Sequence, residues 1–233
     1  MSQGDSDALL ELHRALGEVV ADLADAGGFA HAGRLVADFG VQHLGADIAA
    51  VSRHLRRGGL DLVAATDDIG AELVALRVRD PDLPGGRPLA EGEIVQVPRA
   101  WHPLAADLGL ESALLVGLPQ LSSGPAALEL YSSEQDAFAK TRSEISRLAR
   151  VAGTALRFAE RRVNLEDALH THDIIGRAQG LLMERYRLTG DQAMSYLRRH
   201  SQQSQQPIRE LAAHLVGQHE TEAGTAHHGA EAD

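Results

Sequence analysis

The 233-residue sequence contains no cysteine, and aromatic residues make up only 3% of it. Without cysteine the chain can form no disulfide, no cysteine-ligated zinc site and no thiol nucleophile, so a reducing compartment suits it. The scarcity of aromatic rings argues against base stacking as a principal activity. No run of about 18 apolar residues is present, and the first residues lack the basic and apolar regions of a signal peptide. We therefore expect a cytoplasmic protein with no membrane contact.

Hydrophobic residues make up 44% of the chain and charged residues 24%, which is typical of a globular protein. The net charge of −11 is unevenly distributed. Between residues 160 and 218 there are eight arginines against seven acidic residues, so the rest of the chain carries the negative charge. Such asymmetry points to nucleic-acid or membrane contact, although a solvated helix face would produce it equally well.

The first half of the sequence predicts an α+β unit built on antiparallel hairpins. Apolar residues at three- and four-residue steps predict two helices, at 8–25 and 29–44. Short β-like runs separated by turn residues predict paired strands rather than alternating βαβ units, so an all-parallel sheet is disfavoured. The remaining elements expected here are strands at 48–55, 60–66, 93–97, 112–118 and 126–131, a helix at 69–78, and a loop at 80–88.

From about residue 133 to 183 the sequence is compatible with one long helix, because it contains no proline. One stripe on this helix has the alternating three- and four-residue spacing of a coiled coil. The stripe is either a dimerisation seam or a face that packs back on the sheet. Its members are Ile145, Leu148, Ala152, Ala155 and Ala159.

Two shorter helices are expected after the long one, which should end near Arg187. Thr189 and Gln192 match a capping box, so a helix should begin there and run to about His200. A polar connector follows at 201–206, and Pro207 suits the first turn of the last helix. Residues 219–233 have almost nothing to bury and are expected to be disordered.

Residues 161–218 resemble an ANTAR domain in register over three helices. The resemblance rests on the run IGRAQGLLMER at 175–185, followed by Leu188-Thr189, Ala193, Leu197-Arg198-Arg199, Ser201-Gln202 and Leu211-Ala212.

Residues 1–140 are similar to a GAF sensor domain. The similarity rests on Ala46-Asp47 before a strand, on Ala64-Ala65-Thr66-Asp67, and on the strand 127–132 before the long helix. The expected fold is therefore a GAF-like antiparallel sheet flanked by helices, a coiled-coil-like linker helix at 141–160, and an ANTAR three-helix bundle.

The resemblance implies a transcription antitermination regulator. ANTAR domains bind RNA stem-loops in nascent transcripts, and they commonly act as dimers. The residues assigned to RNA contact are Arg177, Ala178, Gln179, Gly180, Arg185, Arg198, Arg199, Ser201 and Gln202. Arginines suit phosphates and base edges, and a glycine permits close approach. Gly180 could instead serve tight packing between helices.

The sequence departs from the family pattern at positions where lysine is usual. Gln179 stands after the motif alanine, and Gln205 and Pro207 occupy the usual asparagine and lysine positions near the third helix. Each lost phosphate contact weakens RNA binding and its salt dependence. The alternative is therefore a signalling module whose ANTAR bundle docks a protein, such as a sensor or kinase partner.

The sequence contains no motif of an enzyme or metal site. It has no GxSxG elbow, no phosphate-binding GxxxxGK[ST] loop and no HExxH spacing. No catalytic or metal-ligating residue is therefore assigned. GAF domains bind different small molecules or none, so the fold names no ligand.

Overall fold

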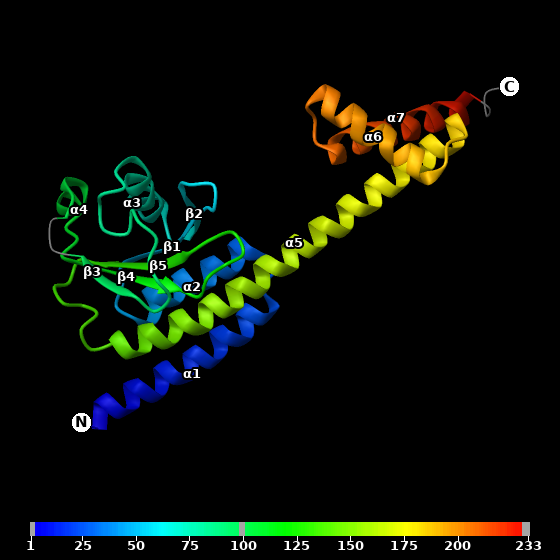
Figure 1. The fold of residues 1–233 in the computed structure, drawn as a ribbon. Helices are drawn as coiled ribbons and strands as arrows, with labels where there is room; N and C mark the ends of the chain where they lie inside the picture. The colour runs from blue at the N-terminus through cyan, green and yellow to red at the C-terminus, as the bar shows by residue number, and fades with distance from the viewer. Residues whose placement is uncertain (1–2, 98–100, 230–233) are drawn as a thin grey trace. The chain divides into compact units, whose positions relative to one another are not determined.

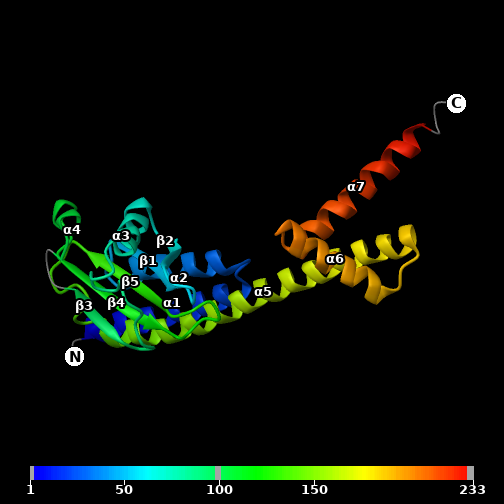
Figure 2. The same cartoon turned by 45° about the horizontal axis from the view of Figure 1, so that its top comes forward.

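The computed structural model describes residues 3–97 and 101–229, which divide into two compact units, Met1–Val163 and Asn164–Asp233. Each unit is described by itself (Figures 1 and 2). The helices are α1 (Gln3–Asp25), α2 (Phe29–His43), α3 (Asp68–Arg79), α4 (Pro103–Asp107), α5 (Arg142–Tyr186), α6 (Gly190–Ser204) and α7 (Ile208–Gly229). The strands are β1 (Ile48–His54), β2 (Leu60–Ala65), β3 (Ile94–Val97), β4 (Ser112–Leu118) and β5 (Ala126–Ser132). No helix in the described part of the chain is long and apolar enough to cross a bilayer.

The first unit is built on one five-stranded antiparallel sheet with the strand order β2-β1-β5-β4-β3. The hairpins β1–β2 and β4–β5 pair as the sequence predicts, and β3 lies at an edge. The central strands β4 and β5 are buried along their whole length. The structure confirms the expected α+β class. It has an antiparallel sheet, flanking helices and a long helix that leads to further helices.

Alternation along the strands sends successive side chains to two separate cores. Leu114 and Val116 face a core shared with α1, α2 and the first part of α5. Ala113 and Leu115 face the opposite core, which includes Leu73 of α3 and residues next to α4. Figure 1 shows the corresponding layers, with α1, α2 and α5 on one side of the sheet and α3 and α4 on the other.

The stripe expected on the long helix belongs to the first of these cores. Ile145, Leu148 and Ala152 are fully buried, Ala159 is nearly so, and Ala155 packs against the same cluster. A seam between two chains needs side chains that are exposed in one chain. The structure therefore corrects the assignment of this stripe to a dimer seam, because the sheet covers it.

A polar cluster is buried on the second face of the sheet. Glu129 of β5 pairs with Arg77 of α3 and accepts hydrogen bonds from Ser52 and from the Tyr131 hydroxyl, the latter at 2.7 Å. Arg77 Nη2 also lies 2.6 Å from the Tyr131 hydroxyl oxygen. Burial, followed by the adjacent Glu129 charge, raises the pKa of Tyr131 well above its usual value. Both members of the Arg77–Glu129 pair are almost completely buried, so each depends on the other for its charge.

The loop expected at 80–88 covers this cluster. Gly85 has a φ of +79°, and a Cβ there would lie 2.2 Å from Leu115 Cδ2 and 2.8 Å from Arg77 Nη1. Only glycine fits this conformation and this approach. The loop therefore closes over the guanidinium of Arg77.

Helix α5 begins at Arg142 rather than near residue 133, and residues 133–141 form turns. Asp47 Oδ2 accepts hydrogen bonds from Ser133 N at 2.6 Å and Ser133 Oγ at 2.7 Å. The backbone bond from Ser133, and then its hydroxyl bond, hold the pKa of Asp47 below its ordinary value. These long-range bonds hold Ser133 outside a helix, and Asp136 adopts a left-handed φ of 55°. The helix therefore starts later than its composition suggests.

Two other boundaries differ from expectation. α6 continues through the predicted connector to Ser204 and ends at Gln205, whose φ of 56° is left-handed. Residues 219–229, for which disorder was expected, continue α7 in the structure, whereas 230–233 lie outside the described residues. Extending an existing helix needs no new nucleation, and alanine and glutamate favour it.

Glu160 of α5 fastens the loop between β4 and β5 to the helix. Its carboxylate accepts hydrogen bonds from Ser122 N at 2.6 Å and Ser123 N at 2.9 Å, and from the Ser122 hydroxyl. Burial alone would raise the pKa of Glu160, but the bonds from Ser122 and Ser123 outweigh burial and hold this pKa below the ordinary 4.5. The bonds therefore favour the ionised carboxylate.

Candidate nucleic-acid interface

The second unit is a small bundle made by the end of α5 with α6 and α7. Its core contains six buried apolar residues, of which four are alanine or valine. These are Ala178, Leu182, Ala193, Leu197, Ala212 and Val216. Small core residues let the three helices approach closely, so side chains on the outer faces are held on a rigid frame.

The start of α6 is fixed by the predicted capping box. Thr189 N donates to Gln192 Oε1 at 2.9 Å, and Gln192 N donates to Thr189 Oγ1 at 3.4 Å. α5 ends at Tyr186, and Arg187 has a left-handed φ of 50°. The chain therefore turns sharply from α5 into α6.

Two of the residues assigned to RNA contact are used inside the bundle. Ala178 has no exposed surface, so it packs the core and is corrected from RNA contact to a structural role. Gln179 Nε2 donates to the carbonyl of Gly190 at 2.7 Å, which ties α5 to the first residue of α6. A third, Ser201, is half-buried and donates to the Gln206 carbonyl beyond the end of α6.

Gly180 lies on an open face of α5. It is exposed, and a Cβ built there would meet no atom within 4 Å; the same holds for Gly176, one turn earlier. Among the described residues, Gly180 therefore packs against no other helix. The backbone of α5 is open to close approach at these two positions.

The arginines differ in their partners. Arg177 pairs with Glu220 of α7, so its charge is compensated. Arg185, Arg198 and Arg199 are exposed, and none of them forms an ion pair within the described residues. Helical spacing places Arg198, Arg199 and Gln202 on the outer face of α6. This face therefore carries two positive charges beside an amide.

An aromatic cluster beside these arginines was not expected from the sequence. The rings of Tyr186 and Tyr196 are stacked with centroids 6.3 Å apart, and His200 lies 4.5 Å from Tyr196. The Arg199 guanidinium lies 6.0 Å from the Tyr196 ring centroid. Two of the chain's three tyrosines thus meet here, ten residues apart in the sequence. The closeness of these two tyrosines in the sequence could have indicated the cluster, whereas the low total content of aromatic residues could not.

The cluster borders a cavity of about 410 Å³ between the three helices. The apolar part of the wall is formed by Leu181, Leu182 and Leu215. The polar groups come from Glu184, Arg185, Gln218 and His219. A cavity of this kind, with flat rings and hydrogen-bonding groups at its edge, has the chemistry that an unstacked base needs. Within the described residues no cluster of metal-ligating side chains is present.

The chain is similar in fold to several solved sensor and regulator structures. A bacteriophytochrome from R. palustris has 11% identity and a TM-score of 0.52, covering 80% of this chain and 46% of that one. An N-acylhomoserine lactone dependent LuxR-family transcription factor from Burkholderia cenocepacia has 17% identity and a TM-score of 0.51, covering 64% of this chain and 99% of that one. The GAF domain of a phosphoenolpyruvate-protein phosphotransferase from Coxiella burnetii has 16% identity and a TM-score of 0.49, covering 68% of this chain and 98% of that one.

At 11–17% identity, the likenesses to the bacteriophytochrome and the LuxR-family factor show the fold alone and no activity. The chain spans less than half the length of the bacteriophytochrome, at 46%. The comparison with curated proteins gave no match. The second unit is more specific, because the family model of the ANTAR domain matches residues 163–216. The chain therefore contains an ANTAR domain, whereas for the first unit the comparisons show a likeness of fold alone.

Proposed function

We propose that the chain is an RNA-binding transcription antitermination regulator, in which the ANTAR bundle binds hairpins in nascent mRNA. The observation that carries the proposal is the family match at residues 163–216 together with the exposed arginines of α6 inside it, which form no ion pair with any described residue. Regulation of this kind needs no catalysis, and we propose that the chain is not an enzyme. Binding to nascent transcripts would place it in the cytoplasm.

Arg198, Arg199 and Gln202 are the proposed contacts to the RNA backbone and base edges. Arginine forms charge-assisted bonds to phosphate, and glutamine both donates and accepts. The stacked pair Tyr186–Tyr196 is the proposed aromatic surface for a loop base, since both rings border the cavity. Gly180 offers a second place where RNA backbone could approach the helix.

The first unit is the proposed sensor, and the active form is a homodimer that holds two bundles for paired hairpins. A signal acts by shifting the population of binding-competent chains. The structure does not identify the chemical class of this signal, because the Arg77–Glu129 cluster fills the interior on the second face of the sheet.

The competing function is docking of a protein by the ANTAR bundle. One observation favours it: the amide of Gln179, which stands where lysine is usual, is engaged with Gly190. A lysine there would offer a charge to phosphate, and this amide offers none.

The test is titration of the full chain with a pool of small tandem-loop RNA hairpins and with random RNA, at about 50 and about 200 mM salt. Arg198→Ala should weaken binding to all hairpins and lower the salt slope by about one. Tyr196→Leu should cost about 1–3 kcal/mol of affinity, because leucine cannot stack on a base. Arg57→Ala, which removes an exposed arginine of the first unit, is the matched control and should change neither quantity.

Equal affinity for hairpins and random RNA at both salt concentrations, with the chain folded, would contradict the proposal. Capture of a protein partner by the same bundle would then favour docking.

A further inference from the structure

Helix α7 continues well beyond the family match. The match ends at residue 216, and Val216 is the last residue of the buried core, whereas α7 runs on to Gly229. The side chains from 217 to 221 are all exposed. A helical segment that buries nothing gains no stability from a core, so packing does not explain why the helix continues. We call residues 217–233 the acidic extension, because of the charges that it carries.

The acidic extension changes the charge of the second unit. Residues 163–216 contain six arginines and six acidic residues, so with neutral histidines they carry no net charge. The extension contains four acidic residues and no lysine or arginine. The four are Glu220, Glu222, Glu231 and Asp233. Their negative charge repels a polyanion, so the extension opposes RNA binding by the rest of the unit.

Glu220 of the acidic extension is bound to an arginine of α5. Its Oε1 accepts a hydrogen bond from Arg177 Nη2, and the two side chains form an ion pair. Arg177 lies inside the family match and is one of the arginines assigned to RNA contact from the sequence. Carboxylate and phosphate oxygens accept the same charge-assisted hydrogen bonds from a guanidinium. Glu220 therefore occupies a donor that a phosphate would use.

The Arg177–Glu220 pair can be exchanged for another partner. The side chain of Arg177 is 49% exposed and that of Glu220 61%. An exposed ion pair is weak, because water and salt screen its charges. A polyanion can therefore displace the carboxylate from the guanidinium.

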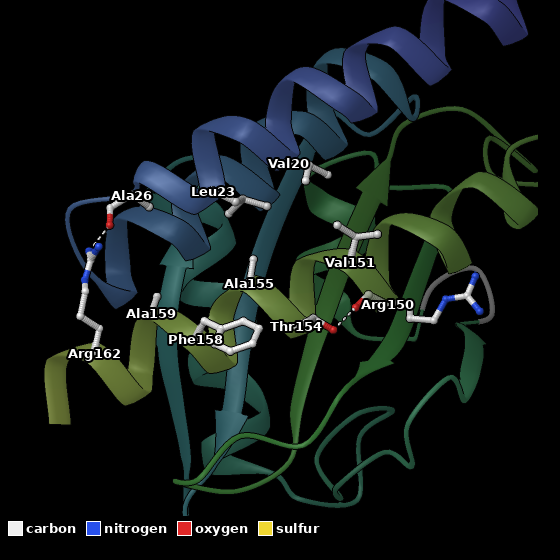
Figure 3. A pocket seen from close by; sticks show the side chains of 10 residues that line it. All are labelled: Val20, Leu23, Ala26, Arg150, Val151, Thr154, Ala155, Phe158, Ala159 and Arg162. Carbon is white, nitrogen blue, oxygen red and sulfur yellow. Dashed lines mark hydrogen bonds between the residues drawn. The ribbon is translucent and has the colours of Figure 1, made fainter. Parts of the chain in front are cut away.

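Two hollows of the structure differ in the groups that line them. The groove between α1 and α5 of the first unit has a volume of about 670 Å³ and is lined mostly by carbon (Figure 3). Arg150 points away from it, and Arg162 donates to the Ala26 carbonyl. The cavity of the second unit has polar groups at its edge instead, and Gln218 and His219 of the acidic extension are two of them. The extension therefore reaches this cavity as well as the arginine.

We propose that the acidic extension is an autoinhibitory segment, which competes with RNA for Arg177 and for the cavity beside Tyr186 and Tyr196. RNA has to displace Glu220 before a phosphate can bind Arg177. Any event that draws the extension away from α5 therefore raises the affinity for RNA. The inference rests on the RNA binding of the proposed function and adds a control that lies outside the family match.

Titration of the full chain with the pool of tandem-loop hairpins measures this competition. Glu220→Gln frees Arg177, so it should raise the affinity about three- to tenfold at about 50 mM salt and steepen the salt slope by about one. Glu210→Gln, the matched control, removes the same charge from another exposed glutamate of α7 and should raise the affinity by less than about twofold. Both glutamates are exposed, so both variants should keep the helical signal of the unmodified chain.

A second substitution separates the ion pair from net charge. In the unmodified chain Glu220 already engages Arg177, so Arg177→Ala should weaken hairpin binding by less than about twofold. In the Glu220→Gln background the same substitution should weaken it about three- to tenfold, because the freed arginine then contacts phosphate. Equal effects of Arg177→Ala in the two backgrounds would overturn the proposal.

Inorganic polyphosphate is a second probe that needs no RNA fold. Polyphosphate requires only available cations, so Glu220→Gln should raise its affinity for the full chain by a similar factor. If this rise occurs and no hairpin binds, the RNA function is wrong and the masking of Arg177 stands. If hairpins bind with the same affinity to the unmodified chain and to Glu220→Gln, the RNA function stands and the autoinhibition is wrong. An equal rise in Glu210→Gln, or no binding of either probe to any variant, would also overturn the autoinhibition.

Discussion

The first unit of the chain buries charged side chains, whereas the second buries none among the described residues. In the first unit, Arg77, Glu129 and Glu160 are buried and engaged with groups of the same unit. In the second, the arginines of α6 are exposed and form no ion pair among the described residues, and four of the six buried core residues are alanine or valine. Buried charges that are paired within the chain serve the fold, whereas exposed charges without an ion-pair partner remain available to bind a ligand. This contrast is the physical basis for proposing that the second unit is the one that binds a charged ligand.

The largest expected loss of stability comes from breaking the buried Arg77–Glu129 pair of the first unit. Arg77→Met leaves Glu129 buried without its counter-ion and should lower the free energy of unfolding by about 3–5 kcal/mol. Urea unfolding followed by the emission of Trp101, the chain's single tryptophan, measures it. Adding Glu129→Leu to the same variant should recover most of the loss. A single substitution with less than about 1 kcal/mol of effect would show that the pair is not buried as described.

A comparable change in the second unit tests whether the two cores are independent. Leu197 is fully buried, so Leu197→Ala should destabilise the bundle by about 2–5 kcal/mol. Thermal unfolding by far-ultraviolet circular dichroism should then show an earlier helical transition. The Trp101 transition should stay where it is, because that residue reports the other core. A parallel shift of both transitions would mean that the units unfold as one.

The smallest effect concerns pH. The folded pKa of Glu160 lies below its ordinary value, so its stabilising contribution is fully present above about pH 4.5 and is lost as pH falls through the folded pKa. Glu160→Gln should cost about 1–3 kcal/mol at neutral pH, because an amide cannot accept all the bonds from Ser122 and Ser123. Urea unfolding of both proteins from pH 7 to pH 3 should show the difference shrinking. A difference that stays constant over this range would contradict the role of the carboxylate.

Periodicity and turn chemistry predicted most elements of the fold. Apolar runs of strand length located β4 and β5, and Thr189 with Gln192 located the start of α6. The starting residue of α5 was missed because it depends on Asp47, which bonds Ser133 from 86 positions away. Such long-range bonds leave no local pattern.

The candidate site was predicted less completely. Three- and four-residue spacing is the same for a helix that packs on a sheet and for one that packs on a partner, so it could not assign Ile145 or Leu148. The buried state of Ala178 and the bond of Gln179 to Gly190 depend on how three helices meet. The pairing of Tyr186 with Tyr196 likewise requires the turn between α5 and α6. By contrast, the exposed arginines of α6 were identified from the sequence, because charge and helical phase are local properties.

The central claim is antitermination by the ANTAR bundle, and transcriptional readthrough tests it most directly. The assay uses a purified transcription system and a template that encodes a tandem-loop hairpin ahead of a terminator. The full chain should raise the fraction of transcripts that pass the terminator, and the double variant Arg198→Ala, Arg199→Ala should not. The account would be contradicted if readthrough were the same with the unmodified chain, with the double variant and without protein. This comparison is made at a saturating protein concentration at which the hairpin is bound.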